Sequence, residues 1–174
     1  MTLNRGFVQI YTGKGKGKTT AALGLALRGA GAGLEVYIGQ FLKSGKYSEN
    51  ISVHSLEKNI VMEAYGNDRF ICGIPCTEEI RLAEEGLKKA REAIFSGKYD
   101  IVILDEINVA LSLGLLEETE VTEMIKARPK TSELVLTGRN APASVMELAD
   151  LITEMKEIKH YYSCGVEARE GIEK

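Results

Sequence analysis

The chain has 174 residues, of which 44% are hydrophobic and 27% charged, and its formal net charge at pH 7 is −3. This length fits a single domain with a substantial core, and no repeat or linker divides residues 1–174. The small negative charge argues against broad nucleic-acid binding, and no apolar run approaches membrane-spanning length. Three cysteines and an N-terminus without a basic-then-apolar pattern favour a reduced, cytoplasmic protein.

Predicted strands and helices alternate along the chain. Short runs rich in apolar and β-branched residues predict strands at residues 7–11, 35–41, 59–65, 101–104, 133–137 and 151–155. Helix-forming or helically spaced runs predict helices at residues 18–31, 77–94, 119–128 and 142–149. Residues 51–56 fit either a short strand or a short helix. The alternation predicts one nucleotide-binding α/β domain, with a mostly parallel sheet and helices on both faces, of the recombinase-like phosphate-loop NTPase type.

A basic, glycine-rich segment separates the first predicted strand from the first predicted helix. Its residues are Thr12, Gly13, Lys14, Gly15, Lys16, Gly17, Lys18, Thr19 and Thr20. Alternating glycines let the backbone curl and point its N–H groups at phosphate oxygens, and the following helix adds its positive N-terminal end. In such a loop Lys18 supplies charge to the phosphates and Thr19 supplies a hydroxyl to Mg²⁺.

This loop departs from the usual G-x-x-x-x-G-K-[ST] pattern. Thr12 stands at the first glycine position, and Gly13 comes one residue late. We therefore expect a tighter loop than in common NTPases. A basic glycine turn without a ligand is the alternative, but the strand–turn–helix context favours a nucleotide site.

Two acidic residues and an arginine follow later strands. Asp105 and Glu106 come after the strand at 101–104, where open α/β sheets bind ligands, and Mg²⁺ on nucleotide phosphates needs one or two hard oxygen ligands. Arg139 follows the strand at 133–137 and is expected on the same rim, where it can donate to a phosphate chain. The alternatives are solvated strand-end acids and a structural arginine that pairs with them.

The longest irregular stretch covers residues 66–76. Its apolar residues Phe70 and Ile71 fit either a lid over a large apolar ligand or a loop packed on its own core. Cys72 and Cys76 are spaced unlike a zinc knuckle, and the chain has only two histidines, so a metal cluster is not expected here.

Blocks spread in order over nearly the whole chain resemble the corrinoid adenosyltransferases of the cobalamin pathway. They are residues 12–20, 40–43, 104–111, 136–142 and 150–155, with Lys159, His160, Gly165 and 171–173 near the end. The blocks 105–111 and 137–140 are quite specific together. The resemblance implies an enzyme that transfers the 5′-deoxyadenosyl group of ATP to the cobalt of a reduced corrinoid, cob(I)alamin or cobinamide, and releases triphosphate.

The resemblance also assigns nucleotide and metal ligands. Residues 13–19 would hold ATP, and Thr19 and Glu106 would bind Mg²⁺. Arg28 and Arg139 match arginines at the nucleotide site, so Lys18, Glu106 and Arg139 are the expected catalytic residues. The chemistry is consistent with this set, because cob(I) is itself a nucleophile and needs no base; the protein must align the reactants and stabilise the leaving group.

The resemblance places the corrinoid against Phe70 and Ile71. The family commonly has Phe-Thr-Trp in this loop, whereas the present chain has no tryptophan. Expected partners are a second copy of the chain and a reductase that supplies reduced cobalt, without nucleic acid or membrane. The competing hypotheses are an ordinary phosphate-loop ATPase or kinase, including a recombinase-like motor, and a nucleotide-binding regulator.

Overall fold

The computed structural model describes residues 3–54, 58–67 and 73–173. Its strands are β1 (Val8–Thr12), β2 (Val36–Phe41), β3 (Ile60–Tyr65), β4 (Ile101–Asp105), β5 (Glu133–Thr137) and β6 (Leu151–Glu154). Its helices are α1 (Lys18–Gly31), α2 (Ser48–His54), α3 (Thr77–Phe95), α4 (Ile107–Ser112), α5 (Glu118–Ala127), α6 (Ala143–Met146) and the 3₁₀ helix η1 (Tyr161–Cys164). The strands form one sheet in the order β3-β2-β4-β5-β1-β6, with every pair parallel.

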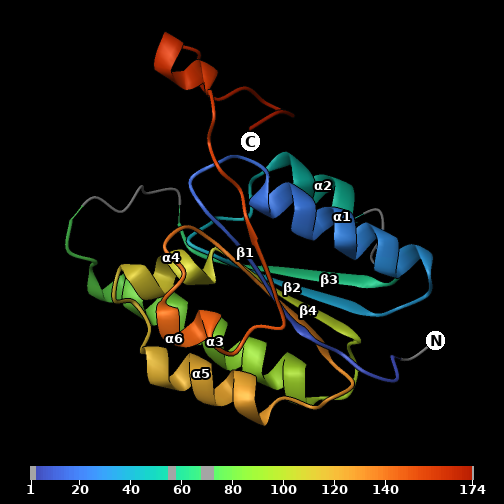
Figure 1. Cartoon of the computed structure of the whole chain (residues 1–174). Coiled ribbons are helices and arrows are strands. Elements are labelled where there is room, and N and C mark those ends of the chain that lie inside the picture. Colours follow the sequence, from blue (N-terminus) through green and yellow to red (C-terminus); the bar gives the residue numbers. More distant parts are fainter. Residues whose placement is uncertain (1–2, 55–57, 68–72, 174) are drawn as a thin grey trace.

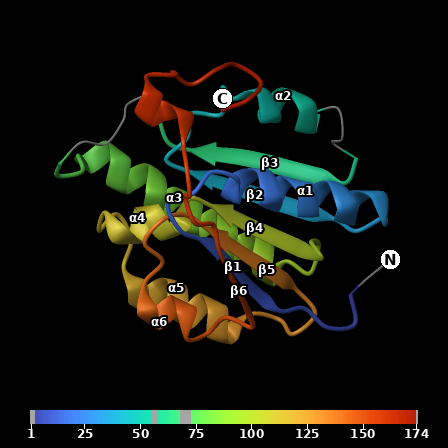
Figure 2. The same ribbon diagram turned by 45° about the horizontal axis from the view of Figure 1, so that its top comes forward.

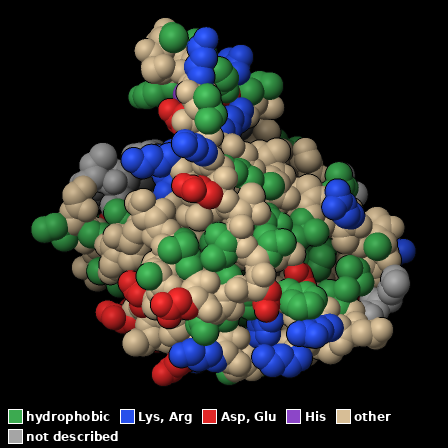
Figure 3. Space-filling model, viewed as in Figure 1, with side chains coloured by type: hydrophobic (Ala, Val, Ile, Leu, Met, Phe, Trp, Pro, Cys, Tyr) green, Lys and Arg blue, Asp and Glu red, His purple; other side chains and the backbone are tan. Residues whose placement is uncertain are grey.

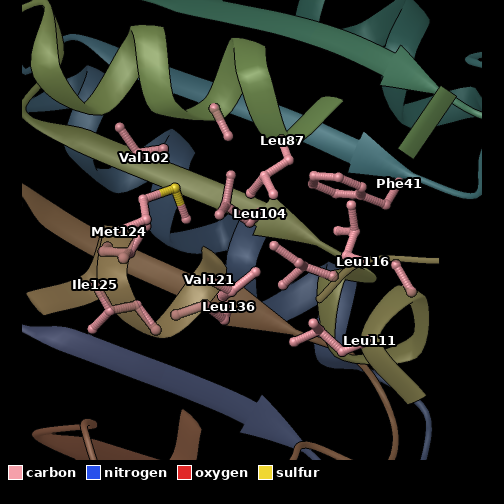
Figure 4. Packing of buried hydrophobic residues seen from close by; sticks show 14 of the residues in the cluster. Phe41, Leu87, Val102, Leu104, Leu111, Leu116, Val121, Met124, Ile125 and Leu136 are labelled. Carbon is pink, nitrogen blue, oxygen red and sulfur yellow. The ribbon is translucent and has the colours of Figure 1, made fainter. Parts of the chain in front are cut away.

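Helices cover both faces of this sheet, as expected (Figure 1). On one face, Ala22 and Ala26 of α1 pack with Ile38, Ile103 and other sheet residues. The opposite face carries α3, α4, α5 and α6, and its core is larger. Figure 4 shows this larger core, in which side chains of α3 and α5 meet those of β4 and β5. The α/β fold class predicted from the alternating pattern is confirmed.

Two local predictions are resolved or corrected. The ambiguous stretch at residues 51–56 enters α2, so its described part is helical. The helix expected at 142–149 is shorter, because α6 ends at Met146. Beyond it, the N–H groups of Leu148 and Ala149 donate to carbonyls three residues back, at 3.1 Å each, and these tight turns lead into β6.

Because all six strands are parallel, their C-terminal ends lie along one side of the sheet, which is called here the carboxyl edge. The glycine-rich loop follows β1 at this edge, and Asp105 closes β4 there. The chain after β6 leaves the body as a projecting segment that ends in η1 and a loop (Figures 1 and 2). Within the described residues, no helix combines the length and apolar character needed to span a membrane.

Candidate functional site

The loop between β1 and α1 is closely packed against the end of β6. Gly13 and Gly17 have backbone φ angles of 94° and 114°, which residues other than glycine rarely adopt. A Cβ atom on Gly13 would lie 2.5 Å from the carbonyl oxygen of Met155, and one on Gly15 would lie 2.7 Å from it. The Gly15 N–H donates to this same oxygen at 2.7 Å. Backbone conformation therefore favours glycine at positions 13 and 17, and lack of space requires it at positions 13 and 15.

Lys18, the first residue of α1, points back into the curl of the loop. Its side-chain ammonium donates to the carbonyl oxygens of Gly13 at 2.9 Å and Gly15 at 2.7 Å, and the residue is 6% exposed. Burial lowers the pKa of Lys18 below its ordinary value, although the nearby Glu106 carboxylate opposes this shift. The ammonium therefore lies at the centre of the loop, where phosphate oxygens can replace the carbonyls as its partners.

A cluster around the buried carboxylate of Asp105 forms the floor of the site. Thr19 and Thr137 donate their hydroxyls to Oδ1 at 2.9 and 2.6 Å. Gln40 donates its amide to Oδ2 at 3.2 Å, and the Lys43 ammonium lies 2.9 Å from the same oxygen. Four segments of the fold therefore meet at one carboxylate.

The strand order explains why these residues meet. β4 lies between β2 and β5, and the register pairs Gln40 directly with Asp105. Thr137 ends β5 on the other side. Sequence reasoning did not assign Gln40 or Thr137 to the site. A polar Gln40 within an otherwise apolar strand was the available signal, because a buried polar side chain needs a partner.

The Lys43 ammonium is the positively charged group at the centre of this cluster. Its ammonium lies 2.9 Å from Asp105 Oδ2 and 3.4 Å from both Thr19 Oγ1 and Glu49 Oε1. Burial opposes the charge on Lys43, but the carboxylates of Asp105, Glu49 and Glu106 together outweigh it and raise the pKa above the ordinary value. Hydroxyl and carboxylate oxygens that surround a cation are also the ligands that Mg²⁺ prefers, so the donor set fits this metal.

Glu106 lies beside the cluster as the N-cap of α4. Its backbone N–H donates to the Thr137 hydroxyl at 3.0 Å, and its φ is 62°. Burial and the neighbouring Asp105 carboxylate raise the pKa of Glu106, while Lys43, Lys18 and Arg139 oppose the shift. Among the described residues, no donor is bonded to the Glu106 carboxylate, which leaves it available to a metal or ligand.

Backbone strain is concentrated at the same edge. In the described chain, three non-glycine residues have positive φ: Leu42 at 62°, Glu106 at 62° and Asn140 at 56°. They follow β2, β4 and β5, the strands that carry Gln40, Asp105 and Thr137. Such conformations cost free energy and often mark functional sites.

The remaining residues predicted for the nucleotide site differ in how close they lie to the loop. The exposed Arg139 lies near enough for its charge to act on Lys18 and Glu106. Arg28 is in the last turn of α1, about 15 Å along the helix from Lys18 at 1.5 Å per residue, so the fold does not bring it to the loop. Lys14 and Thr20 are exposed beside the loop. The ligand-contact roles of all these residues stay predictions.

The predicted corrinoid residues, Phe70 and Ile71, lie outside the described residues. Cys72 also falls there. The part of the chain that is described contains no group of three or more His, Cys, Asp or Glu side chains that could hold a metal. A metal at the Asp105 cluster would therefore take further ligands from a bound molecule or water.

The projecting C-terminal segment contacts the outer side of the loop. Glu173 lies 2.9 Å from the Lys16 ammonium and also accepts the Tyr161 hydroxyl. Arg169 donates to Glu173 through its backbone N–H at 2.8 Å and its guanidinium at 3.2 Å, and its guanidinium lies 4.9 Å from the centre of the Tyr161 ring. This second carboxylate cluster links residues 161–173 to the loop.

Comparisons with known proteins identify the family of this chain. The family described as ATP:corrinoid adenosyltransferase BtuR/CobO/CobP matches residues 4–173. A corrinoid adenosyltransferase of Pseudomonas aeruginosa is 32% identical, over 97% of this chain and 84% of the relative. One of Sinorhizobium sp is 34% identical over 99% and 82%, and one of Escherichia coli K12 is 31% identical over 97% and 86%. These similarities give no support to an ordinary phosphate-loop ATPase or kinase; the chain belongs to the ATP:corrinoid adenosyltransferase family.

Proposed function

We propose that this chain transfers the 5′-deoxyadenosyl group of ATP to the cobalt of a reduced corrinoid. The cob(I) electron pair attacks C5′ of ATP and forms a cobalt–carbon bond. The bond between C5′ and the α-phosphate oxygen breaks, and its electron pair leaves with inorganic triphosphate. No proton is transferred, so the protein needs to align the two reactants and stabilise the negative charge that grows on the leaving group.

The observation that carries this proposal is the joining of the phosphate loop to the Asp105 cluster. Lys18 is held inside the loop by Gly13 and Gly15, and the next residue, Thr19, is bonded to Asp105. In the proposed complex, the triphosphate replaces the carbonyl partners of Lys18, and Arg139 donates to the same anion from the rim. This set of cations suits a polyphosphate leaving group.

We further propose that Mg²⁺ binds at the position that the Lys43 ammonium occupies. Thr19 and Asp105 already surround that ammonium, and the Glu106 carboxylate lies next to them. When bound, the metal would supply positive charge to the triphosphate oxygens. Lys43 would then move toward Glu49, its other acidic neighbour, or toward the phosphates.

The products of the reaction test the proposed function. Purified protein is mixed with ATP and corrinoid under anaerobic reduction, and phosphorus NMR is recorded while the corrinoid spectrum is followed. We expect triphosphate and adenosylcorrinoid in equal amounts, and neither product when cobalt stays oxidised. ADP and orthophosphate formed at a rate indifferent to corrinoid would overturn the proposal. The Lys18→Ala variant controls for contaminating activity.

The corrinoid is proposed to contact Phe70 and Ile71. The nearest described residues before them, Gly66 and Asn67, follow the end of β3, which lies next to β2. This supports a corrinoid site on the carboxyl edge, the edge that also carries the glycine-rich loop. Phe70→Ala should raise the corrinoid KM or lower kcat while leaving the KM for ATP unchanged. Phe95→Ala removes an exposed aromatic ring on α3 and is the control. An effect confined to ATP would contradict the assignment.

A homodimer is proposed from the outer edge of β6. Leu151 and Ile152 are 45% and 47% exposed, and in the described chain no strand pairs with this edge. An exposed apolar strand edge favours association with another chain. Sedimentation should show a dimer that Ile152→Lys dissociates, whereas the same change at Ile74, which is 96% exposed elsewhere, should have no effect. A monomeric parent chain would refute this proposal.

The reduced cobalt is proposed to come from a separate reductase, and the reaction to take place in the cytoplasm. Cob(I) requires an electron donor, and ATP is a cytoplasmic substrate. Cys76 and Cys164 are both free thiols, which supports a reducing compartment. Adenosylcorrinoid formation from oxidised corrinoid should therefore depend on an added flavoprotein reductant. Equal rates with this protein alone and NAD(P)H would exclude the need for a partner.

A further inference from the structure

A second basic depression lies at the opposite edge of the sheet. It has a volume of about 330 Å³ and is formed by three segments that each precede a strand: residues 5–8, 125–130 and 148–150. β1 separates it from the glycine-rich loop, and five strand residues span about 16 Å. This pocket, called here the amino-edge pocket, is therefore distinct from the nucleotide site.

The amino-edge pocket is strongly positive within an acidic protein. Its lining includes the cationic residues Arg5, Lys126, Arg128 and Lys130, against one carboxylate, Asp150. The whole chain, by contrast, has a net charge of −3. In Figure 3, Lys and Arg side chains gather in the lower part of the view, beside hydrophobic atoms. A local excess of cations in a concave site raises the local concentration of anions.

Arg128 is buried in this pocket with an unused donor. Its side chain is 5% exposed, and its Nη2 atom lies 3.3 Å from the Gly6 carbonyl oxygen and 3.6 Å from Asp150. Among the residues that the structure describes, its Nε–H has no partner. Asp150 does not satisfy this donor, because its carboxylate faces Nη2 at 3.6 Å and accepts the Val8 N–H at 2.8 Å. Buried guanidinium donors are normally satisfied, so this one indicates a missing acceptor.

The other cations are free to turn toward the same acceptor. Lys126 and Lys130 are exposed and form no ion pair within the described residues. The Arg5 guanidinium lies 4.8 Å from the centre of the Phe7 ring, which holds it at the rim. The nearby Glu133 carboxylate is already occupied by the Phe7 N–H and the Gln9 amide, at 2.7 and 2.6 Å. An incoming anion therefore meets cations that have few competing partners.

We propose that the amino-edge pocket binds the phosphate group of a small phosphorylated molecule. A guanidinium with an in-plane donor and two mobile ammonium groups match the several oxygens of a phosphate. Phe7, Ile125 and Leu148 provide an apolar wall for the organic part of the ligand. The volume fits a small ligand of this class, and the site is independent of the ATP chemistry at the opposite edge.

The test uses two probes, orthophosphate and phenyl phosphate, followed by amide NMR of the full chain. We expect both to shift resonances of residues 5–8, 125–130 and 148–150, with phenyl phosphate binding more tightly because of the apolar wall. Shifts at residues 13–19 serve as an internal reference for binding at the proposed nucleotide loop. Equal affinity of the two probes would restrict the ligand to a free inorganic phosphate. No shift at the amino edge, at concentrations that saturate the loop, would overturn the proposal.

Variants test whether the cationic side chains of the pocket bind the phosphate. Lys126→Ala with Lys130→Ala changes two exposed residues and should weaken phenyl phosphate binding about tenfold, since each contact is charge-assisted. Lys88→Ala with Lys89→Ala removes the same charge from exposed positions on α3 and should leave affinity unchanged. Arg128→Lys keeps the charge but removes the in-plane donor, and should also weaken binding. Phenyl phosphate affinities equal to that of the parent chain in all three variants would contradict the proposal.

Discussion

Asp105 and Glu173 each gather several donors beside the phosphate loop, but in different surroundings. Asp105 is 1% exposed and receives donors from α1, β2 and β5. Glu173 lies on the projecting segment with its side chain 14% exposed, and its partners Lys16 and Arg169 have side chains that are 40% and 52% exposed. The same type of chemical group is thus used once inside the body and once on its surface.

The difference in burial predicts a difference in strength. Salt screens charges on the surface at about 10 Å in 0.1 M solution, whereas buried pairs are screened far less. Exposed ion pairs also contribute little to stability, while a buried pair is costly to break. The Asp105 cluster is therefore expected to be a fixed floor for the nucleotide, and the Glu173 cluster a contact that forms and separates readily.

The largest expected effect is that of Asp105→Asn on folding. The amide would place a donor against the donors of Gln40 and Lys43 and remove the nearest carboxylate of the buried Lys43 ammonium, which would keep only the more distant Glu49. We expect the free energy of unfolding to fall by about 3 kcal/mol, measured by urea denaturation. Glu84→Gln, at an exposed position on α3, is the control. Equal stability of the two variants would mean that the buried cluster is no stronger than a surface pair.

The next effect concerns two lysines of the loop that belong to different regions. Lys18 is buried and faces the inside of the loop, whereas Lys16 binds Glu173 on the outside. Lys18→Ala should weaken ATP binding by about 2 kcal/mol, or roughly thirtyfold, because a charge-assisted phosphate contact is lost. Calorimetry should find a much smaller loss for Lys16→Ala. Unchanged ATP affinity in Lys18→Ala would refute the phosphate-loop assignment.

Glu106→Gln separates metal binding from nucleotide binding. Because no described donor occupies its carboxylate, the substitution should disturb the fold less than Asp105→Asn does. We expect turnover to need about tenfold more Mg²⁺, while ATP affinity measured without metal stays near that of the parent chain. Glu84→Gln, at an exposed position on α3, is again the control. If turnover kept its Mg²⁺ dependence, Glu106 would have no part in metal binding.

The sequence predicted the local part of the site and missed the part that depends on strand order. Residues 13–19 were recognised because loop, helix start and lysine are contiguous in the chain. Asp105 was assigned for the same reason, from its position after an apolar run. Gln40 and Thr137 were not, because their contact with Asp105 requires β4 to lie between β2 and β5. Such neighbours are set by packing of the whole sheet.

The assignment of Arg28 to the nucleotide site rests on the family resemblance alone, and the geometry of α1 does not support it. Arg28 shares α1 with Lys18 but is ten residues away, about 15 Å along the axis. The bond between Lys16 and Glu173 spans 157 positions of the sequence, and nothing in the local pattern of either residue indicates it.

The smallest expected effect, and the sharpest test of the comparison, is that of Glu173→Gln on the C-terminal segment. Hydrogen bonds from Arg169 and Tyr161 hold the pKa of Glu173 well below its ordinary 4.5. A carboxylate with a lowered pKa keeps its contacts above that ordinary value and loses them only as pH falls through the lowered one. The segment should therefore stay attached at pH 4.5 in low salt, and separate either in strong acid or at high salt.

NMR signals of Tyr161 report this attachment directly, because its hydroxyl and ring both contact the cluster. In Glu173→Gln they should show the separated state at every pH, with urea stability and ATP affinity close to those of the parent chain. Glu170→Gln removes an exposed acid three residues away and should change nothing. If Glu173→Gln instead lowered stability as much as Asp105→Asn, the projecting segment would be part of the folded body, and the contrast between the two carboxylates would not hold.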